Sequence, residues 1–457
     1  MWLRFLGWLM PGLRIKRWLL VFALAVACGA AGLSLITRTP LLANLEALLQ
    51  KVASGPGGGL GPAAAAIVLL VAGLGLATWA ILRLADSVAD AFWPGRSHQL
   101  KEAILRRRQL ERGPRVVAIG GGTGLPVLLR GLKQYSANLT ALVTVADDGG
   151  SSGRLRAELG ILPPGDLRNC LIALADIEPL MERLLQHRFQ NRSQLAGHSF
   201  GNLLIAAMSE ITGDFFRSLG LVSQVLAVRG RVLPITLAHV RLAAELADGR
   251  QVTGESAITN ARAGPVRRVW LEPEDVAPLP EALTALAEAD VIVIGPGSLY
   301  TSILPNLLVN GVADAIRSSG ALKIYVCNVM TQPGETDGYD VARHVQALFE
   351  HAGPGLFDRV LVNTGPVAAL VRERYAEEGA EPVAIDKRAL KATGLRVIGR
   401  RLVTDSPVVR HDPELLGQAV MAEVFNNAGA WPSVQKPKSG ALGRERQPSD
   451  KCLEEGK

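Results

Sequence analysis

Residues 115–132 read RVVAIGGGTGLPVLLRGL, and they decide the fold that the rest of the chain builds. A short β-branched run ends in glycines, and an apolar pattern with helical spacing follows from Leu125 to Leu132. Glycines let the backbone turn tightly and approach a ligand, because no Cβ intervenes. The helix would offer free N–H groups and the positive end of its dipole to a phosphate group. The stretch therefore predicts a strand, a helix and, between them, a ligand loop at Gly120, Gly121, Gly122, Thr123 and Gly124.

The spacing of these glycines argues against two common nucleotide chemistries. It departs from the GxGxxG pattern of dinucleotide-binding proteins, and no Lys-Ser or Lys-Thr pair follows as in a P-loop. We therefore expect neither hydride transfer nor ATP hydrolysis. The alternative is a glycine-rich turn without a ligand, but three consecutive glycines cost stability unless a close approach requires them.

Strands and helices alternate along the chain beyond this loop. Further strands are indicated at 141–146, 232–236, 290–294, 323–328 and 358–363, with helices dominating 167–228 and another at 341–351. Such alternation predicts a parallel sheet covered by helices on both faces, which is the α/β class. Two short runs around Asp248-Gly249 predict a hairpin, and the polar segment 431–457 is predicted to be disordered.

Two uncharged apolar segments precede this region, at Trp18–Ile36 and Leu60–Leu82. Each is long enough to cross a hydrocarbon core of about 30 Å as a helix. The first could instead be a signal peptide, but its apolar run is longer than usual and a second segment follows. Lys and Arg gather before the first segment and after the second, which predicts a two-helix anchor in the cell membrane with both termini cytoplasmic.

The charge of the chain belongs mainly to this N-terminal part. The formal net charge is +7, and residues 1–113 contain 13 Lys and Arg against 5 Asp and Glu, so the remaining residues are close to neutral. A nucleic-acid-binding core would carry its own basic stripe, so no nucleic-acid partner is expected. The four cysteines are far apart and form no CxxC pair, which indicates a reducing compartment and no zinc site.

A second polar loop, DDGGSSGR at 147–154, follows the second strand. In an open parallel sheet it would face the same crevice, at the carboxyl ends of the strands, as the glycine loop. Carboxylates there can hold a ribose hydroxyl or coordinate Mg²⁺ beside a phosphate, and arginine can pair with phosphate oxygens. The alternative is a surface turn. The candidates are Asp147, Asp148, Ser151, Ser152 and Arg154, with Asp147 and Asp148 as metal ligands only if the protein depends on Mg²⁺.

Four further motifs would reach the same edge of the sheet. They are LPPGDLRNC at 162–170, GHSFGN at 197–202, GPGSLY at 295–300 and the Asn that follows the strand at 323–328. The first could instead cap a helix through its Asp, and a single His is more often structural than functional. No Ser-His-Asp set or HExxH motif occurs, so no catalytic residue is assigned. The candidate ligand-binding residues are Asp166, Asn169, His198, Asn202, Gly295, Gly297, Ser298 and Asn328.

Taken in order, six motifs resemble those of the 2-phospho-L-lactate transferase-like superfamily: GGGTGLPVLLRGLK, ADDGGSSGRLR, PPGDLRN, HSFGNLLI, GPGSLYTSILPNLLV and CNVMTQPGETDGY. The resemblance covers about 115–426 and is closest to the bacterial gluconeogenesis factors. It implies a Rossmann-like nucleotide-binding domain, at 114–430 here, with the nucleotide at the first glycine loop. The domains expected around it are a membrane anchor at 1–83, a juxtamembrane linker at 84–113 and the tail at 431–457.

For gluconeogenesis factors the resemblance implies binding of UDP-N-acetylglucosamine or UDP-glucose. It also implies a role in cell shape and cell-wall precursor supply during gluconeogenic growth. For the transferase branch it implies transfer of a phospholactyl group from a guanosine diphosphate carrier to a deazaflavin, with Mg²⁺. The leading hypothesis is a UDP-sugar-binding homo-oligomer that acts with cell-wall synthesis regulators at the membrane, and the alternative is the Mg²⁺-dependent transferase.

Overall fold

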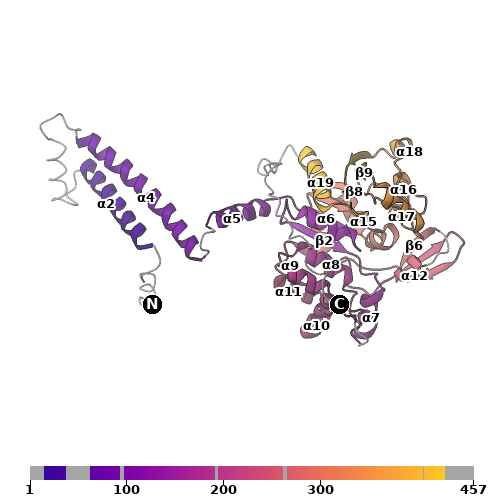
Figure 1. The fold of residues 1–457 in the computed structure, drawn as a ribbon. Helices are drawn as coiled ribbons and strands as arrows, with labels where there is room; N and C mark the ends of the chain where they lie inside the picture. The colour runs from indigo at the N-terminus through magenta and orange to yellow at the C-terminus, as the bar shows by residue number, and fades with distance from the viewer. Residues whose placement is uncertain are drawn as a thin grey trace, which may run out of the picture. The chain divides into compact units, whose positions relative to one another are not determined.

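The computed structural model describes residues 15–37, 62–92, 97–190, 194–260, 265–404 and 406–427. The chain divides into two compact units, Met1–Arg107 and Arg108–Lys457, and each is described by itself (Figure 1). The predicted disordered tail, 431–457, lies outside the described residues, as does the loop between the two apolar segments.

The N-terminal unit contains two helices, α2 (Ile15–Thr37) and α4 (Pro62–Phe92), that pack antiparallel. Glycines bring their backbones together: a Cβ on Gly73 would lie 2.9 Å from the nitrogen of Gly29, and one on Gly32 would lie 3.0 Å from the Ala66 carbonyl oxygen. At the other end of the pair, the Trp18 and Trp79 rings meet edge to face, with centroids 4.9 Å apart. Small residues at a close helix crossing are typical of helices that pack in membranes.

The outward surface of this helix pair is apolar. Leu20, Val71 and Leu74 are 71%, 66% and 73% exposed, respectively. Both helices are long and apolar enough to cross a membrane, and only 22% and 17% of their apolar windows are buried within the protein. Two predicted apolar helices are therefore present, with surfaces that suit a hydrocarbon environment better than water. A third helix, α5 (Ser97–Glu111), follows them.

A seven-stranded parallel sheet forms the centre of the second unit, in the order β10-β9-β8-β7-β1-β2-β3. The predicted α/β class is confirmed. The strands are β1 (Val116–Gly120), β2 (Leu139–Val143), β3 (Arg231–Pro234), β7 (Val291–Ile294), β8 (Leu322–Val326), β9 (Arg359–Asn363) and β10 (Arg396–Arg400). The chain moves outward from β1 to β3 and then returns to the other side of β1 to place β7. Strand order therefore reverses between β1 and β7, and ligands of doubly wound sheets bind at such a switch point.

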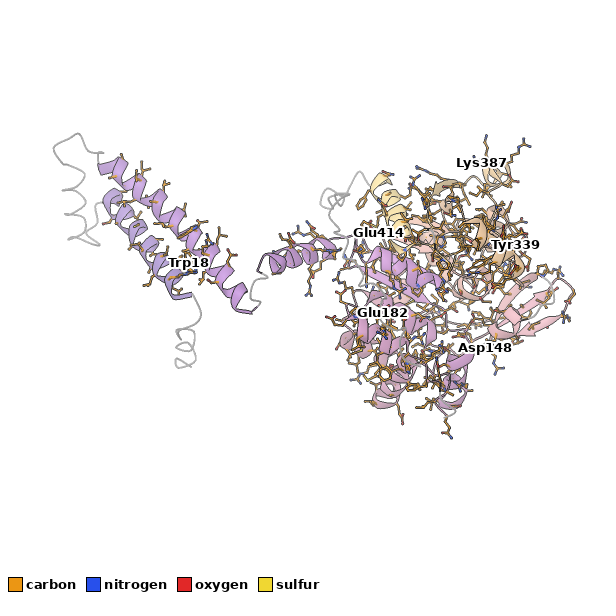
Figure 2. The ribbon with its side chains drawn as sticks, in the orientation of Figure 1. Trp18, Asp148, Glu182, Tyr339, Lys387 and Glu414 are labelled. Carbon is orange, nitrogen blue, oxygen red and sulfur yellow. The ribbon has the colours of Figure 1, made fainter. Side chains whose placement is uncertain are left out.

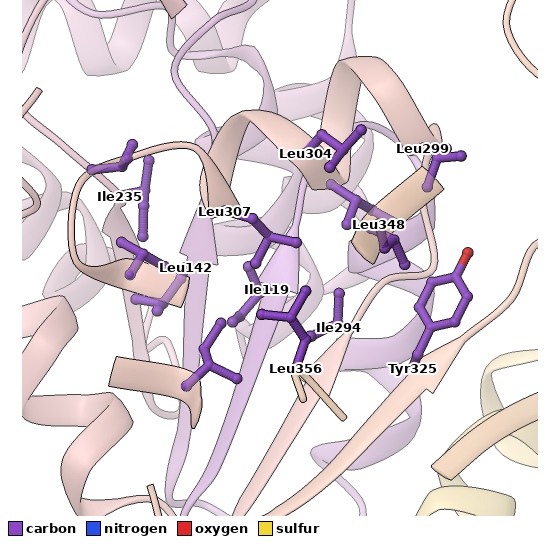
Figure 3. Close-up of a cluster of buried hydrophobic side chains, with 14 of the residues drawn as sticks. Ile119, Leu142, Ile235, Ile294, Leu299, Leu304, Leu307, Tyr325, Leu348 and Leu356 are labelled. Carbon is purple, nitrogen blue, oxygen red and sulfur yellow. The ribbon is translucent and has the colours of Figure 1, made fainter. Parts of the chain in front are cut away.

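Helices cover both faces of the sheet because strand residues alternate in direction. Val117 and Ile119 of β1 enter one apolar cluster, whereas Val116 and Ala118 enter the other. In Figure 3, Ile119 lies on one face together with Leu304 and Leu307 of α14. That face carries α13 (Pro280–Glu288), α14 (Leu304–Leu307), α15 (Val312–Ser318) and α16 (Val341–Ala352). The opposite face carries α6 (Gly124–Leu132), α8 (Gly165–Leu174), α10 (Phe200–Thr212), α11 (Phe215–Val225) and α19 (Pro413–Asn427).

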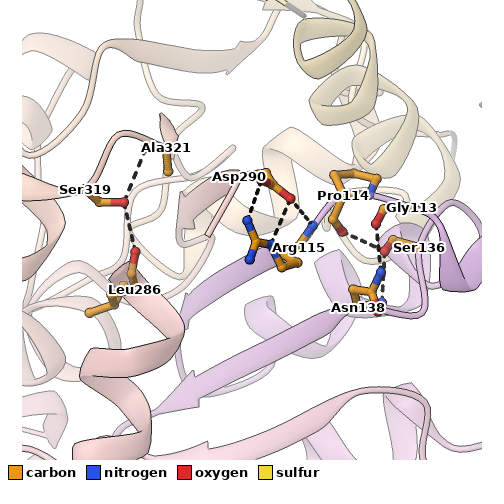
Figure 4. Close-up of polar contacts among 9 residues, drawn as sticks. All are labelled: Gly113, Pro114, Arg115, Ser136, Asn138, Leu286, Asp290, Ser319 and Ala321. Carbon is orange, nitrogen blue, oxygen red and sulfur yellow. Dashed lines mark hydrogen bonds and ion pairs between the residues drawn. The ribbon is translucent and has the colours of Figure 1, made fainter. Parts of the chain in front are cut away.

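Hydrogen bonds fix the amino ends of the strands, at the edge opposite the switch-point loops (Figure 4). The Arg115 side chain donates to Asp290, with its NH2 nitrogen 3.1 Å from Oδ1, and so ties the start of β1 to the start of β7. Ser136 and Asn138 donate to the carbonyl oxygens of Pro114 and Gly113 and hold the start of β2. The switch point thus rests on strands whose relative register is fixed.

A small antiparallel sheet, ordered β5-β4-β6, lies beside the main one. Its hairpin of β4 (Arg241–Leu246) and β5 (Gln251–Thr253) confirms the prediction around Asp248-Gly249. The third strand, β6 (Val266–Glu272), was not predicted and forms an edge of this sheet. The remaining helices are α7 (Gly150–Leu159), α9 (Pro179–Gln186), α12 (Glu255–Asn260), α17 (Ala369–Glu377), α18 (Lys387–Ala392) and the π-helix η2 (Leu299–Ile303).

Candidate ligand-binding site

The glycine loop lies between β1 and α6 at the switch point, in contact with the loop after β7. Gly122 adopts a φ of 60°, which an L side chain rarely takes. A Cβ on Gly124 would lie 2.4 Å from the Pro296 carbonyl oxygen, so any side chain would force the two loops apart. Asn306 donates its Nδ2 to the Gly120 carbonyl oxygen at 3.1 Å. The loop is held from both sides, and only glycine fits at its close contact with the second loop.

The loop after β7 is held by Asn328, which follows β8. Asn328 donates Nδ2 to the Gly297 carbonyl oxygen at 2.8 Å, and its Oδ1 accepts the Gly297 N–H at 3.3 Å. The Ser298 hydroxyl donates to Gln332 Oε1 at 2.7 Å. Gly295, which has a φ of 80°, makes the turn out of the strand.

A cavity of about 210 Å³, which we call the switch-point pocket, opens between these two loops. Five predicted residues line it: Thr123, Gly124, Gly297, Ser298 and Asn328. The structure adds Arg410 and His411 from the segment before α19, which the sequence did not single out. The Nε2 atom of His411 is buried without a hydrogen-bond partner among the described residues, and burial lowers the pKa of its imidazole to about 4. His411 is therefore neutral and offers an unused hydrogen-bonding atom.

Asp166 supports the glycine loop from behind. Its Oδ2 accepts the Gly122 N–H at 2.6 Å, across 44 residues of sequence. The helix-cap alternative is wrong, because Asp166 lies within the first turn of α8 and Pro164 occupies the cap position. Burial, with a smaller contribution from the charge of Asp147, raises the pKa of Asp166 to about 6.

Asp147, Asp148 and Ser152 join the acidic loop to its neighbours. The Asp147 side chain accepts the Gly149 N–H at 2.8 Å, and burial raises its pKa. Ser152 accepts the Gly165 N–H at 3.1 Å, which places it against the start of α8. Asp148 accepts the Ser256 N–H at 2.9 Å and so connects the loop to α12, beside the small sheet (Figure 2).

A second polar cluster contains the remaining candidates. The Ser151 hydroxyl lies 3.0 Å from His198 Nδ1 and accepts from Asn202 Nδ2 at 3.0 Å. Arg168 donates to Asn202 Oδ1 at 2.8 Å and to Asn169 Oδ1 at 2.7 Å. Burial lowers the pKa of His198, and the charge of Arg154 lowers it further.

Arg154 contacts the segment that precedes His198. Its guanidinium donates to the Ala196 carbonyl oxygen at 2.7 Å and lies next to Gly197. It therefore borders the Ser151–His198 cluster. The structure thus places the predicted residues at three locations. One is the switch-point pocket, and one is the cluster around Ser151. The third is the acidic loop with the start of α8, where Asp147, Asp148, Ser152 and Asp166 lie.

Two carboxylates near these groups were missed, the half-buried Glu255 and the buried Glu335. Glu255 at the start of α12 has its pKa raised to about 9 by burial and by the nearby charges of Asp147 and Asp166. Glu335, which accepts from Gln332 Nε2 at 2.7 Å, has its pKa raised to about 7 by burial. Glu335 lies within the motif CNVMTQPGETDGY but was assigned no role, and Glu255 lies outside the six motifs. Carboxylates with raised pKa values are frequent at functional sites.

The acidic loop does not have the geometry of a metal centre in this structure. Among the described residues, no three His, Cys, Asp or Glu side chains are arranged to hold a metal ion. The carboxylates of Asp147 and Asp148 instead accept backbone N–H groups. The Mg²⁺ site at Asp147 and Asp148 stays a prediction, and no step is derived through it.

Strand order, switch point and paired glycine loops define a doubly wound α/β protein with its candidate site at the carboxyl edge of the sheet. Residues 116–403 match the family described as 2-phospho-L-lactate transferase CofD, and the chain belongs to this family. The resemblance found in the motifs is confirmed.

Relatives and a solved structure agree with this assignment. A protein named gluconeogenesis factor from Halalkalibacterium halodurans is 54% identical over 67% of this chain and 95% of its own length. A protein of the same name from Bacillus subtilis is 55% identical over 65% of this chain and 94% of its own length. A Nostoc sp. relative is 49% identical over 91% of both chains. A crystal structure of a UPF0052 family member from Bacillus halodurans is 54% identical, with a TM-score of 0.66, and covers 68% of this chain and 99% of that one.

Proposed function

We propose that this protein is a gluconeogenesis factor that binds a UDP-sugar, UDP-N-acetylglucosamine or UDP-glucose, in the switch-point pocket. It would regulate cell-wall precursor supply, and hence cell shape, during gluconeogenic growth. The proposal rests on the family and on the names of the relatives. A homo-oligomer and cell-wall synthesis regulators as partners remain predictions.

The observation that carries the proposal is the pair of glycine loops at the switch point. Gly122 and Gly124 keep side chains out of the space beside the first turn of α6, where N–H groups and the helix dipole favour a phosphate. The pocket of about 210 Å³ is smaller than the roughly 300–1,000 Å³ of a typical ligand site. It would hold the diphosphate and part of the ligand, with the rest along the open edge of the sheet. His411 and Arg410 line the same pocket and would lie beside the ligand.

We further propose that α2 and α4 anchor the protein in the cell membrane. Their apolar outward surface and their glycine-packed contact support this placement. The distribution of Lys and Arg supports cytoplasmic termini, so that the α/β unit would face the cytoplasm. The ligand site would then lie on the side of the membrane where nucleotide-sugars occur.

The test is a calorimetric titration of UDP-N-acetylglucosamine into the full-length protein in detergent, with GDP for comparison. We expect UDP-N-acetylglucosamine to bind without turnover, and Gly122→Arg to abolish binding because its side chain would meet Ser302 and fill the loop. Gly320→Arg is the matched control, because a Cβ there has no neighbour within 4 Å and the residue lies at the amino end of β8.

The same titration separates the two hypotheses about function. Binding of GDP alone, and only in the presence of Mg²⁺, would reject the UDP-sugar proposal in favour of the transferase. Loss of UDP-N-acetylglucosamine binding in both arginine variants would also count against the pocket, because it would show that any added arginine disturbs the protein.

A further inference from the structure

A second and larger cavity, of about 640 Å³, lies between β6 and α16, away from the switch-point pocket. We call it the β6–α16 cleft. Arg267 and Arg268 line it from the strand, and Arg343 lines it from the helix. Trp270 and Leu308 add partly exposed apolar side chains to the lining. The cleft thus has arginines on two elements, some apolar surface and a volume within the range of metabolite sites.

The charged side chains that line the cleft are three arginines and two glutamates, and one of the guanidinium groups is available to an anion. Arg267 is paired with Glu245 and Arg343 with Glu350, at 2.8 and 2.9 Å. Among the described residues, the Arg268 guanidinium has no ion-pair partner. Guanidinium groups bind phosphate and carboxylate oxygens in a planar, two-pronged geometry that few other side chains provide.

His351 argues against a peptide strand as the occupant. β6 is an edge strand and could in principle pair with an added strand. However, its central Val269 N–H already donates to His351 Nε2 at 3.1 Å, while His351 Nδ1 lies 2.7 Å from the Ala347 carbonyl oxygen. Burial lowers the pKa of His351, which fits the neutral ring that these two bonds require. The edge is therefore blocked at its middle, and a small molecule fits better than a strand.

We propose that the β6–α16 cleft is an effector site for a phosphorylated sugar, with one phosphoryl group at Arg268 and another at Arg343. The sugar ring would lie over Trp270 and Leu308, and its hydroxyls would reach Glu274 and Glu350, which also line the cleft. The site is separate from the switch-point pocket, and its ligand binding does not depend on the function proposed for that pocket.

An aromatic network connects the cleft to the loop after β7. The His351 ring packs edge to face on Tyr300, with centroids 5.7 Å apart, and the Tyr300 hydroxyl lies 2.9 Å from that of Tyr339. Arg343 in turn lies 5.3 Å from the Tyr339 ring centroid. Tyr300 belongs to η2, which begins directly after Ser298, and π-helical turns are frequent at functional sites. An effector that repositions Arg343 would therefore shift the switch-point loop, and this coupling rests on the proposed function.

The first test is calorimetric titration of fructose 1,6-bisphosphate into the full-length protein in detergent, with inorganic phosphate for comparison. We expect the bisphosphate to bind more tightly than phosphate. Arg268→Glu should weaken it by at least about tenfold, because it reverses the charge facing one phosphoryl group. Arg250→Glu is the matched control, since Arg250 is an exposed arginine in the turn between β4 and β5 and does not line the cleft. Equal effects of the two variants, or no binding to the wild type, would overturn the site.

The second test measures coupling. Saturating fructose 1,6-bisphosphate should change the affinity for UDP-N-acetylglucosamine, and the reverse titration should show the same factor. Tyr339→Phe removes the hydroxyl contact with Tyr300 without altering a cleft-lining residue, so it should retain bisphosphate binding and lose the coupling. Bisphosphate binding without UDP-sugar binding would support the effector site in the β6–α16 cleft and reject the proposed function of the switch-point pocket. Two bound ligands without mutual effect would reject the coupling.

Discussion

Asp166 holds the glycine loop through its bond to Gly122, although burial penalises its charge. Its pKa rises from 3.8 in the unfolded chain to about 6 in the folded protein. Between these pH values the folded protein binds more protons than the unfolded chain. The free energy of unfolding therefore falls as pH rises, and the destabilisation by the Asp166 charge is complete above about pH 6. The shift corresponds to about 3 kcal/mol. We therefore expect Asp166→Asn to gain stability relative to the wild type from about pH 4 to about pH 6, measured by urea unfolding.

The control for this prediction is Asp337→Asn. Asp337 also accepts a backbone N–H, from Gly334 at 2.8 Å, but it is exposed, and water screens its charge. Asp337→Asn should leave the unfolding free energy close to that of the wild type. Parallel stability curves for Asp166→Asn and the wild type would show that Asp166 does not titrate as the geometry requires.

The residues of the candidate site differ in whether the local sequence could predict them. Gly122 and Gly124 were predictable because a β-branched run, glycines and an apolar helix follow one another locally. The partner of Gly122 was not, because Asp166 lies 44 residues away and the fold alone brings the two together. Glu335 lies in one of the six motifs and Glu255 does not, but the surroundings that raise their pKa values exist only after several elements have packed. Ligand-binding roles for all of these residues stay predictions.

At the scale of elements, α19 is tied to the sheet by a buried ion pair. Glu423 of α19 accepts from Arg359 of β9 at 2.6 Å, and the two side chains are 2% and 8% exposed. Glu423→Ala would remove the buried carboxylate that faces the Arg359 guanidinium, so we expect a loss of about 3–5 kcal/mol in unfolding free energy. Arg396 lies 3.9 Å from the same carboxylate but is 63% exposed, so Arg396→Ala should cost less than about 1 kcal/mol. Equal losses would contradict this ranking, which chemical denaturation measures directly.

The two strands that the sequence did not predict share one property. β6, with the sequence VRRVWLE, and β10, with RVIGR, carry arginines within the strand and lie at the edges of their sheets. An edge strand needs less apolar alternation than a central one, because part of it faces water. The central strands β1, β7 and β8 are buried along nearly their whole lengths, so their continuous apolar runs identified them as strands in the sequence.

At the scale of the molecule, the two units have separate sources of stability. The α/β unit has its own core on both faces of the sheet. In the Bacillus subtilis relative, 94% of the protein matches only 65% of this chain, which leaves no room there for a counterpart of the helix pair. The Nostoc sp. relative matches 91% of this chain, so its match includes part of the N-terminal unit. The helix pair is thus an addition to a unit that folds without it in relatives.

This separation predicts that residues 108–457 form a soluble protein. We expect the full chain to sediment with membranes and to require detergent for extraction, because the outward faces of α2 and α4 are apolar. The fragment 108–457 should stay in the supernatant with the same affinity for UDP-N-acetylglucosamine, measured by calorimetry, since the switch-point pocket lies within it. A full chain that remains soluble without detergent would reject the anchor. A folded fragment that binds the UDP-sugar much more weakly would show that the N-terminal unit contributes to the site.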